Sequence, residues 1–178
     1  NAVEVLDAYD SRIVAGTFEL GKAPDGLVLD DAGHLFVNSF LSRSVVVLDA
    51  VGILTSTNFA LDVITEVVVS DEEKLDPEVL FGKKVFYDAQ DERMGQDGYI
   101  SCAVCHIDGF EDGRIWDFTD RGEGLRNTTS LLGKRGMGQG RLHWSANFDE
   151  VQDFEHDIRG PFAGAGFLSD EVFNEGTR

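Results

Sequence analysis

The feature that most constrains the fold of this 178-residue chain is the pentapeptide Cys102-Ala103-Val104-Cys105-His106, which holds both of its cysteines. The two-residue gap sets the thiols about one helical turn apart. This is the pattern with which a chain attaches a c-type haem. Each thiol forms a thioether with a haem vinyl group, and the histidine ligates the iron. We therefore expect Cys102 and Cys105 to hold one covalent haem c and His106 to be an axial ligand.

Two other kinds of site use closely spaced cysteines. Structural zinc needs a second pair of ligands at similar spacing. The chain has no further cysteine, and its remaining histidines, His34, His143 and His156, are scattered. A dithiol redox motif opens a helix after a strand of a βαβ unit, and the sequence around Cys102 does not read that way. The haem interpretation is therefore preferred to both.

The second axial position of the iron has several candidates, because methionine and histidine both ligate haem iron and some haems keep this position open. His143 and Met137 follow the motif far enough along the chain to reach the other haem face, and Met137 lies in a glycine-rich loop. Met94 precedes Cys102 by only eight residues, which makes that reach awkward. We predict His143 as the second ligand, with Met137 as the alternative.

Charged and aromatic side chains complete the predicted haem pocket. Arg114, Arg126 and Arg141 are candidates for the haem propionates, since a guanidinium matches a carboxylate in a bidentate pair. Trp116 and Trp144 are candidates for its apolar wall. Of these we select Arg126 and Trp144 as haem-binding residues. Surface solvation of the arginines and ordinary core packing of the tryptophans remain the alternatives.

The composition changes near Asp76, which divides the chain into two predicted domains. Before it, apolar runs rich in β-branched residues alternate with turn signals, a pattern typical of strands. Residues 3–8 resemble residues 45–50, an offset of 42 residues. That period belongs to a four-stranded propeller blade. We therefore predict that residues 1–75 form strands resembling one to two propeller blades.

The remainder, residues 76–178, reads as helices joined by loops. A helix is predicted to begin at Pro77, with Asp76 as its N-cap. A second is predicted to begin at Asn147, with Glu150 as its capping-box partner, and to end at Gly160. Glycine and small polar residues interrupt the apolar runs between the two helices. The predicted fold is therefore mixed: a short β segment, then a mainly α, loop-rich cytochrome c-like haem domain.

The charge of the chain limits its partners. With 33 acidic and 15 basic residues its net charge is −18, so a nucleic-acid backbone or an anionic membrane surface would repel it. A basic redox protein fits better. The sequence also contains no apolar run long enough to cross a bilayer, and we expect no membrane insertion.

Five short segments occur in a distinctive order: Gly82-Lys83-Lys84-Val85-Phe86-Tyr87, Ser101-Cys102-Ala103-Val104-Cys105-His106, Asp112-Gly113-Arg114, Arg126-Asn127-Thr128 and Leu142-His143-Trp144. In this order they resemble the first haem domain of propeller-fused cytochromes related to the di-haem cytochrome c peroxidase/MauG group. Residues 21–37 resemble the strand pairs of NHL/YVTN-type propellers. The resemblance implies a periplasmic or secreted protein. It also implies a longer parent chain, with a neighbouring propeller and a second haem domain.

The function expected from these features is electron transfer, with one haem cycling between Fe(III) and Fe(II). The alternative is the peroxidatic half of a di-haem enzyme that reduces hydrogen peroxide, and a non-redox interaction module is the third possibility. Gln152 matches the distal glutamine of the peroxidases, but residues 159–164 lack the acid that follows it there. The peroxidases also use two haems, whereas this chain has one attachment motif. Electron transfer is therefore preferred, and enzymatic activity stays an open question.

Overall fold

A computed structural model describes residues 3–15, 20–133, 138 and 140–176 of the chain. It divides into two compact units, Asn1–Pro77 and Glu78–Arg178. We describe each unit by itself.

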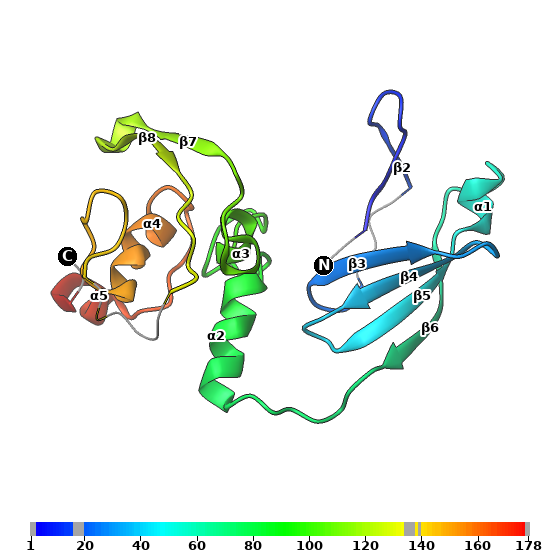
Figure 1. Ribbon diagram of the computed structural model, residues 1–178, viewed down its shortest axis with the longest axis horizontal. Helices are drawn as coiled ribbons and strands as arrows, with labels where there is room; N and C mark the ends of the chain where they lie inside the picture. The colour runs from blue at the N-terminus through cyan, green and yellow to red at the C-terminus, as the bar shows by residue number, and fades with distance from the viewer. Residues whose placement is uncertain (1–2, 16–19, 134–137, 139, 177–178) are drawn as a thin grey trace. The chain divides into compact units, whose positions relative to one another are not determined.

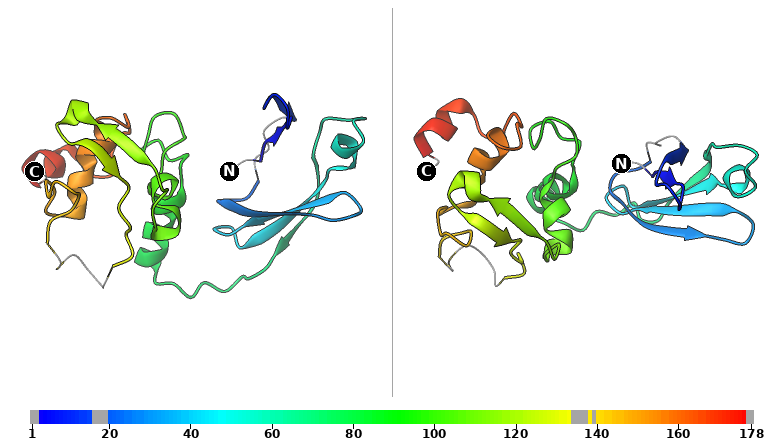
Figure 2. Two further views of the ribbon diagram at one scale, coloured as in Figure 1. Left: turned by 45° about the horizontal axis from the view of Figure 1, so that its top comes forward. Right: turned by 90° about the horizontal axis from the view of Figure 1, so that it is seen from above.

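The first unit is built on a four-stranded antiparallel sheet in which neighbours in sequence are neighbours in space. Figures 1 and 2 show its twist. Its strands are β3 (Pro24–Leu29), β4 (His34–Ser39), β5 (Ser44–Asp49) and β6 (Asp62–Val68). The short helix α1 (Val51–Leu54) lies between β5 and β6, and a hairpin of β1 (Val5–Leu6) and β2 (Ile13–Ala15) precedes the sheet. The apolar runs predicted to be strands lie in β3, β5 and β6, with Val69 just past the end of β6.

The tight turn between β3 and β4 shows how the sequence directs this sheet. Asp30 accepts hydrogen bonds from the backbone N–H groups of Ala32 and His34 at 3.0 and 2.8 Å. Gly33 takes a φ of 87°, a conformation that favours glycine. The side chain of Asp30 and the freedom of Gly33 together reverse the chain within four residues.

One face of the sheet forms the apolar core of this unit. Val37, Val46 and Leu48 alternate with outward-facing residues and are almost completely buried. Val3, Leu20, Ala50 and Leu61 complete the cluster. Burying each large side chain contributes roughly 1.5–3 kcal/mol, so this cluster is the main source of stability in the first unit.

In its described residues, the second unit has short helices and one hairpin. Its elements are α2 (Pro77–Tyr87, which begins at the unit boundary), α3 (Cys102–Cys105), η1 (Ile107–Gly109), β7 (Ile115–Phe118), η2 (Thr119–Arg121), β8 (Gly124–Asn127), η3 (Val151–Phe154), α4 (Glu155–Arg159) and α5 (Asp170–Gly176). The predicted helix that begins at Pro77 is present as α2.

The predicted fold class, a short β segment followed by a mainly α, loop-rich cytochrome c domain, is wrong. The structure combines the four-stranded sheet with small helices, at about 25% helix and 23% strand. In the second unit the β7–β8 hairpin occupies sequence that we predicted to be loop. Its strands alternate exposed and half-buried residues, and Gly122 and Gly124 make the turn with φ of 77° and 69°. The glycines that we read as loop signals close a hairpin.

The helix predicted to begin at Asn147 begins later, with Glu150 as its N-cap and Val151 as its first residue. The capping box joins Glu150 to Asp153, whose buried carboxylate accepts the N–H groups of Asp149 and Glu150 at 2.9 and 3.2 Å. Asn147 bonds elsewhere, since its amide N–H donates to Glu123 at 3.3 Å. The prediction chose the wrong capping pair, and the N-cap lies three residues further on, at Glu150.

Candidate haem site

The attachment motif forms one turn of helix with its histidine at the C-terminal end. Cys102 and Cys105 are the first and last residues of α3, and both are half-buried free thiols. His106 caps the helix, and its N–H donates to the carbonyl of Cys102 at 2.9 Å. The structure therefore presents the two sulfurs and the imidazole from a single turn of chain.

The imidazole of His106 is oriented by a backbone carbonyl. Its Nδ1 lies 2.8 Å from the carbonyl oxygen of Thr129. Because a carbonyl can only accept, Nδ1 carries the proton and donates it, and Nε2 then carries the lone pair. Histidines that ligate metals are held in this way, with the second nitrogen donating to a carbonyl or carboxylate. His106 is thus set in the tautomer that an iron ligand needs.

The segment after β8 lies along the motif turn and supports this bond. The N–H of Leu131 donates to the carbonyl of Gly109 at 2.7 Å. The N–H of Gly109 in turn donates to the carbonyl of His106 at 2.9 Å. The hydroxyl of Tyr87, the last residue of α2, donates to Asp108 at 3.2 Å. The turn that follows the motif is therefore bonded both to the segment after β8 and to the end of α2.

The environment of the thiols keeps them protonated. Burial raises the pKa of Cys102, and the neighbouring Cys105 raises it further. Burial is also the main cause that raises the pKa of Cys105, with Asp112 adding to it and Arg114 opposing. A reactive dithiol needs the opposite, a lowered pKa that makes the thiolate available. The thiols are therefore suited to attachment rather than to disulfide exchange.

The carboxylate of Asp112 interacts with three other residues on two segments of the chain. Its carboxylate accepts the N–H of Arg114 at 3.0 Å and the indole N–H of Trp116 at 2.9 Å. The buried side chain of Thr128 bonds to it as well. Burial by itself would raise the pKa of Asp112, but these hydrogen bonds outweigh it and lower the pKa. Asp112 is thus an ionised anchor between the chain after the motif and the chain after β8.

Arg126 and Trp144, both predicted to bind haem, line one cavity of about 300 Å³ together with Leu125 and Asn127. The indole N–H of Trp144 donates to the carbonyl of Asn127 at 2.9 Å. The Nε of Arg126 is buried and has no hydrogen-bond partner within the described ranges. A buried donor without an acceptor is costly, and a propionate carboxylate would satisfy it.

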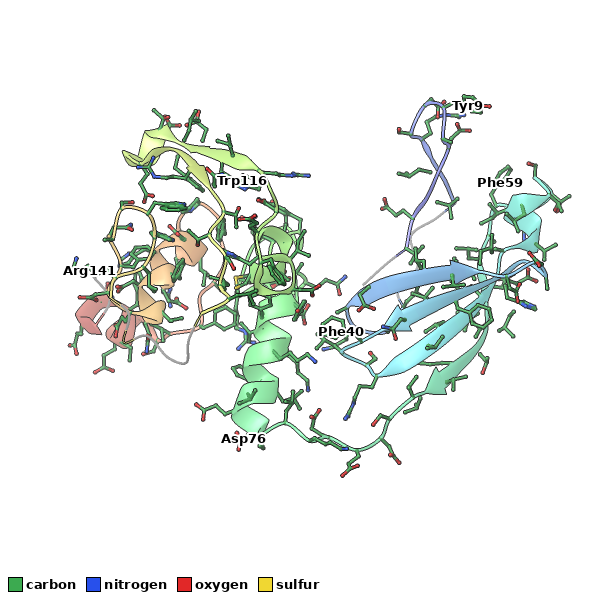
Figure 3. The ribbon with its side chains drawn as sticks, in the orientation of Figure 1. Tyr9, Phe40, Phe59, Asp76, Trp116 and Arg141 are labelled. Atoms are coloured by element: carbon green, nitrogen blue, oxygen red, sulfur yellow. The ribbon has the colours of Figure 1, made fainter. Side chains whose placement is uncertain are left out.

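The other polar candidates lie elsewhere. Arg114 is exposed. Arg141 lies on an exposed loop (Figure 3), where its guanidinium is 3.9 Å from the carboxylate of Asp149. Trp116, labelled on β7 in the same figure, is half-buried and pairs across the hairpin with Arg126. Arg126 therefore differs from Arg114 and Arg141 in having a buried Nε at a cavity.

The predicted axial ligand His143 lies in an aromatic cluster. Its ring centroid is 4.5 Å from that of Phe148 and 4.7 Å from that of Phe154. Its Nδ1 is 3.0 Å from the side-chain oxygen of Asn147, and its φ is 64°. Since an amide oxygen only accepts, the proton again lies on Nδ1. His143 therefore has the same tautomer as His106. The alternative, Met137, lies outside the described residues.

Apolar side chains with exposed surface surround the motif turn. Their exposed fractions run from 45% for Val104 to 58% for Leu132. The others are Ile107, Phe110 and Leu131. Among the described residues of this unit, the buried hydrophobic side chains are Met94, Phe148 and Ile158. Exposed apolar side chains of this kind are available for contact with an apolar ligand.

Sequence reasoning missed two partners of this site. The Thr129 carbonyl is backbone and leaves no side-chain signal. Asp112 was noted within a short motif, without a role, although an Asp-Gly pair just before a strand is itself a turn signal. Its bond to Thr128 joins residues 16 positions apart, which no local pattern reveals.

In the described part of the chain, no group of three or more histidine, cysteine, aspartate and glutamate side chains is arranged to hold a metal ion. Comparisons with models of known families, with curated proteins and with solved structures gave no significant match. Within the described ranges, no helix combines the length and apolar character that a bilayer crossing needs.

Proposed function

We propose that the second unit binds one haem through thioethers to Cys102 and Cys105, with His106 as an iron ligand, and that the protein transfers single electrons. When bound, this group supplies one-electron exchange between Fe(III) and Fe(II). The observation that carries the proposal is the 2.8 Å bond between Nδ1 of His106 and the Thr129 carbonyl. It prepares an imidazole as a metal ligand directly after two thiols on one helical turn.

The thiols of this chain suit the attachment reaction. Each S–H adds across one vinyl double bond, so that a C–S bond forms and the hydrogen goes to the neighbouring carbon. No oxidant is needed, but both sulfurs must be reduced, and Cys102 and Cys105 are free thiols. Burial, which raises the pKa of both, also protects them from oxidation through a thiolate.

The remaining residues bind and orient the haem. Arg126 would donate from its buried Nε to a propionate, and Trp144 would cover the edge of the same cavity. We propose His143 as the second axial ligand, with Met137 as the alternative. The Nδ1 of His143, like that of His106, faces an oxygen acceptor. A second imidazole favours Fe(III) and lowers the reduction potential relative to methionine.

The resemblance to the di-haem peroxidase/MauG group supports this proposal and adds a setting to it. We place the protein in an extracytoplasmic compartment, where haem c is attached in that group. A net charge of −18 fits a basic redox partner. For an electron carrier we expect an iron with both axial positions filled, whereas peroxide reduction needs one open position. A spectrum therefore distinguishes the two functions.

The test is to produce the chain together with a c-type haem attachment system and to examine it denatured. We expect the protein to stay coloured, and its mass to exceed the polypeptide mass by one haem. His106→Ala should retain the haem but lose the low-spin spectrum. The matched control is His156→Ala, at an exposed histidine of α4, which should leave the spectrum unchanged. Loss of all colour from the denatured wild type would contradict the proposal. A high-spin wild type would favour the peroxidatic function.

A further inference from the structure

The hydrogen bond that orients His106 depends on the path of the backbone around Thr129. A carbonyl is a good partner only while its peptide group keeps its direction. Two attachments hold this segment. On one side the N–H of Leu131 donates to Gly109 at 2.7 Å. On the other, β8 ends at Asn127 and pairs with β7, and the buried side chain of Thr128 lowers the pKa of Asp112 through a side-chain hydrogen bond.

Asp112 is itself held in place by rigid partners. The Arg114 N–H and the Trp116 indole N–H donate to different oxygens of its carboxylate, at 3.0 and 2.9 Å. Trp116 pairs with Arg126 across the β7–β8 hairpin. The carboxylate therefore connects the hairpin to the residue next to Thr129. Its charge also acts on Cys105, so it lies within electrostatic reach of the motif.

We propose that Asp112 is a positioning residue that holds the Thr129 carbonyl against His106 and thereby keeps the reduction potential of the haem low. A firmly held acceptor at Nδ1 makes Nε2 a stronger donor to the metal. A stronger imidazole donor stabilises Fe(III) relative to Fe(II), which lowers the potential. This inference rests on the proposed function, because it concerns the ligand of a bound haem.

Three variants of the haem-loaded full chain separate the effect of the charge from that of the positioning. Asp112→Asn keeps the size of the side chain but removes its charge and one acceptor. Thr128→Val keeps the charge at Asp112 but removes the connection to the Thr129 segment. The matched control, Asp117→Asn, removes the same charge from the same hairpin, at an exposed residue that bonds only to Thr119 among the contacts observed.

Two readouts test the inference. The first is the hydrogen exchange rate of the Nδ1 proton of His106, measured by NMR on the reduced, histidine-labelled protein. The second is the reduction potential from a redox titration. We expect Asp112→Asn and Thr128→Val each to raise the exchange rate about fivefold, as expected for one weakened hydrogen bond. Both should raise the potential, with Asp112→Asn giving the larger shift because it also loses the charge.

The outcomes are distinguishable from failure of the proposed function. A wild type that carries no haem contradicts the proposed function before any variant is made. If the wild type carries haem and Thr128→Val has the same exchange rate and reduction potential as the wild type, the positioning role is overturned, even if Asp112→Asn fails to fold. Equal shifts of potential in Asp112→Asn and Asp117→Asn, with no change in exchange, would reduce the effect to general electrostatics and overturn it too.

Discussion

The two units of this chain are stabilised by different means. In the first unit, the buried residues are mainly apolar and pack on one face of a regular sheet. In the second, Asp153, Glu155 and Asp157 are buried to a similar degree as the apolar side chains Met94, Phe148 and Ile158. Asp153 accepts two backbone N–H groups, and Glu155 pairs with Arg159 at 2.8 Å. Buried charges retained in this way give geometric definition more than net stability. We therefore expect the second unit to need a further apolar element for stability, and the proposed haem would supply it.

The largest expected effect comes from removing the haem attachment. Changing Cys102 and Cys105 together to alanine should leave the second unit without its ligand, so its amides should exchange like those of a loosely folded chain. The amides of β4 and β5 should keep their protection, because the apolar cluster of the first unit is intact. Hydrogen exchange with mass spectrometry measures both in one experiment. Equal protection of the second unit's amides with and without haem would contradict the claim that this unit, unlike the first, needs a further apolar element.

The complementary change breaks the first unit. Leu48 is completely buried in the apolar cluster, and Leu48→Ala should lower the free energy of unfolding of this unit by about 2–5 kcal/mol. The control is Val67→Ala on β6, at a half-exposed side chain, which should cost much less. Urea denaturation followed by circular dichroism measures the loss, and the haem spectrum should be unchanged. A similar cost at both positions would contradict the assignment of the core.

A smaller effect concerns pH. Because the folded state lowers the pKa of Asp112, this group contributes stability above its unfolded pKa of about 3.9. That contribution is lost as the pH falls through the lower folded pKa. Acid unfolding of the second unit should therefore be less steep in Asp112→Asn than in the wild type. Glu171→Gln, on the exposed surface of α5, is the control. Identical acid unfolding curves for wild type and Asp112→Asn would contradict the claim that ionised Asp112 stabilises the second unit.

Sequence reasoning succeeded where the determinants are local. β-branched runs such as residues 45–48 lie in strands, and Pro77 starts a helix, because both depend on neighbouring residues. It failed in the second unit, where partners lie far apart in sequence. The capping box of η3 uses Glu150 and Asp153 rather than Asn147. Asn147 instead bonds to Glu123, 24 positions away. The β7–β8 hairpin was missed because its glycines resemble those of a loop.

The 2.8 Å partner of His106 is a main-chain oxygen, and this affects how the site tolerates mutation. Any amino acid at position 129 carries the same carbonyl, so selection there acts on the course of the chain and not on the identity of the side chain. Ser or Val at this position would still present the oxygen. Substituting Ser130 by proline would act on the backbone instead, since a proline restricts the residue before it to extended conformations and so narrows the directions open to the Thr129 carbonyl. The orientation of the imidazole therefore depends on backbone geometry, and the side chain at position 129 can change without loss of this hydrogen bond.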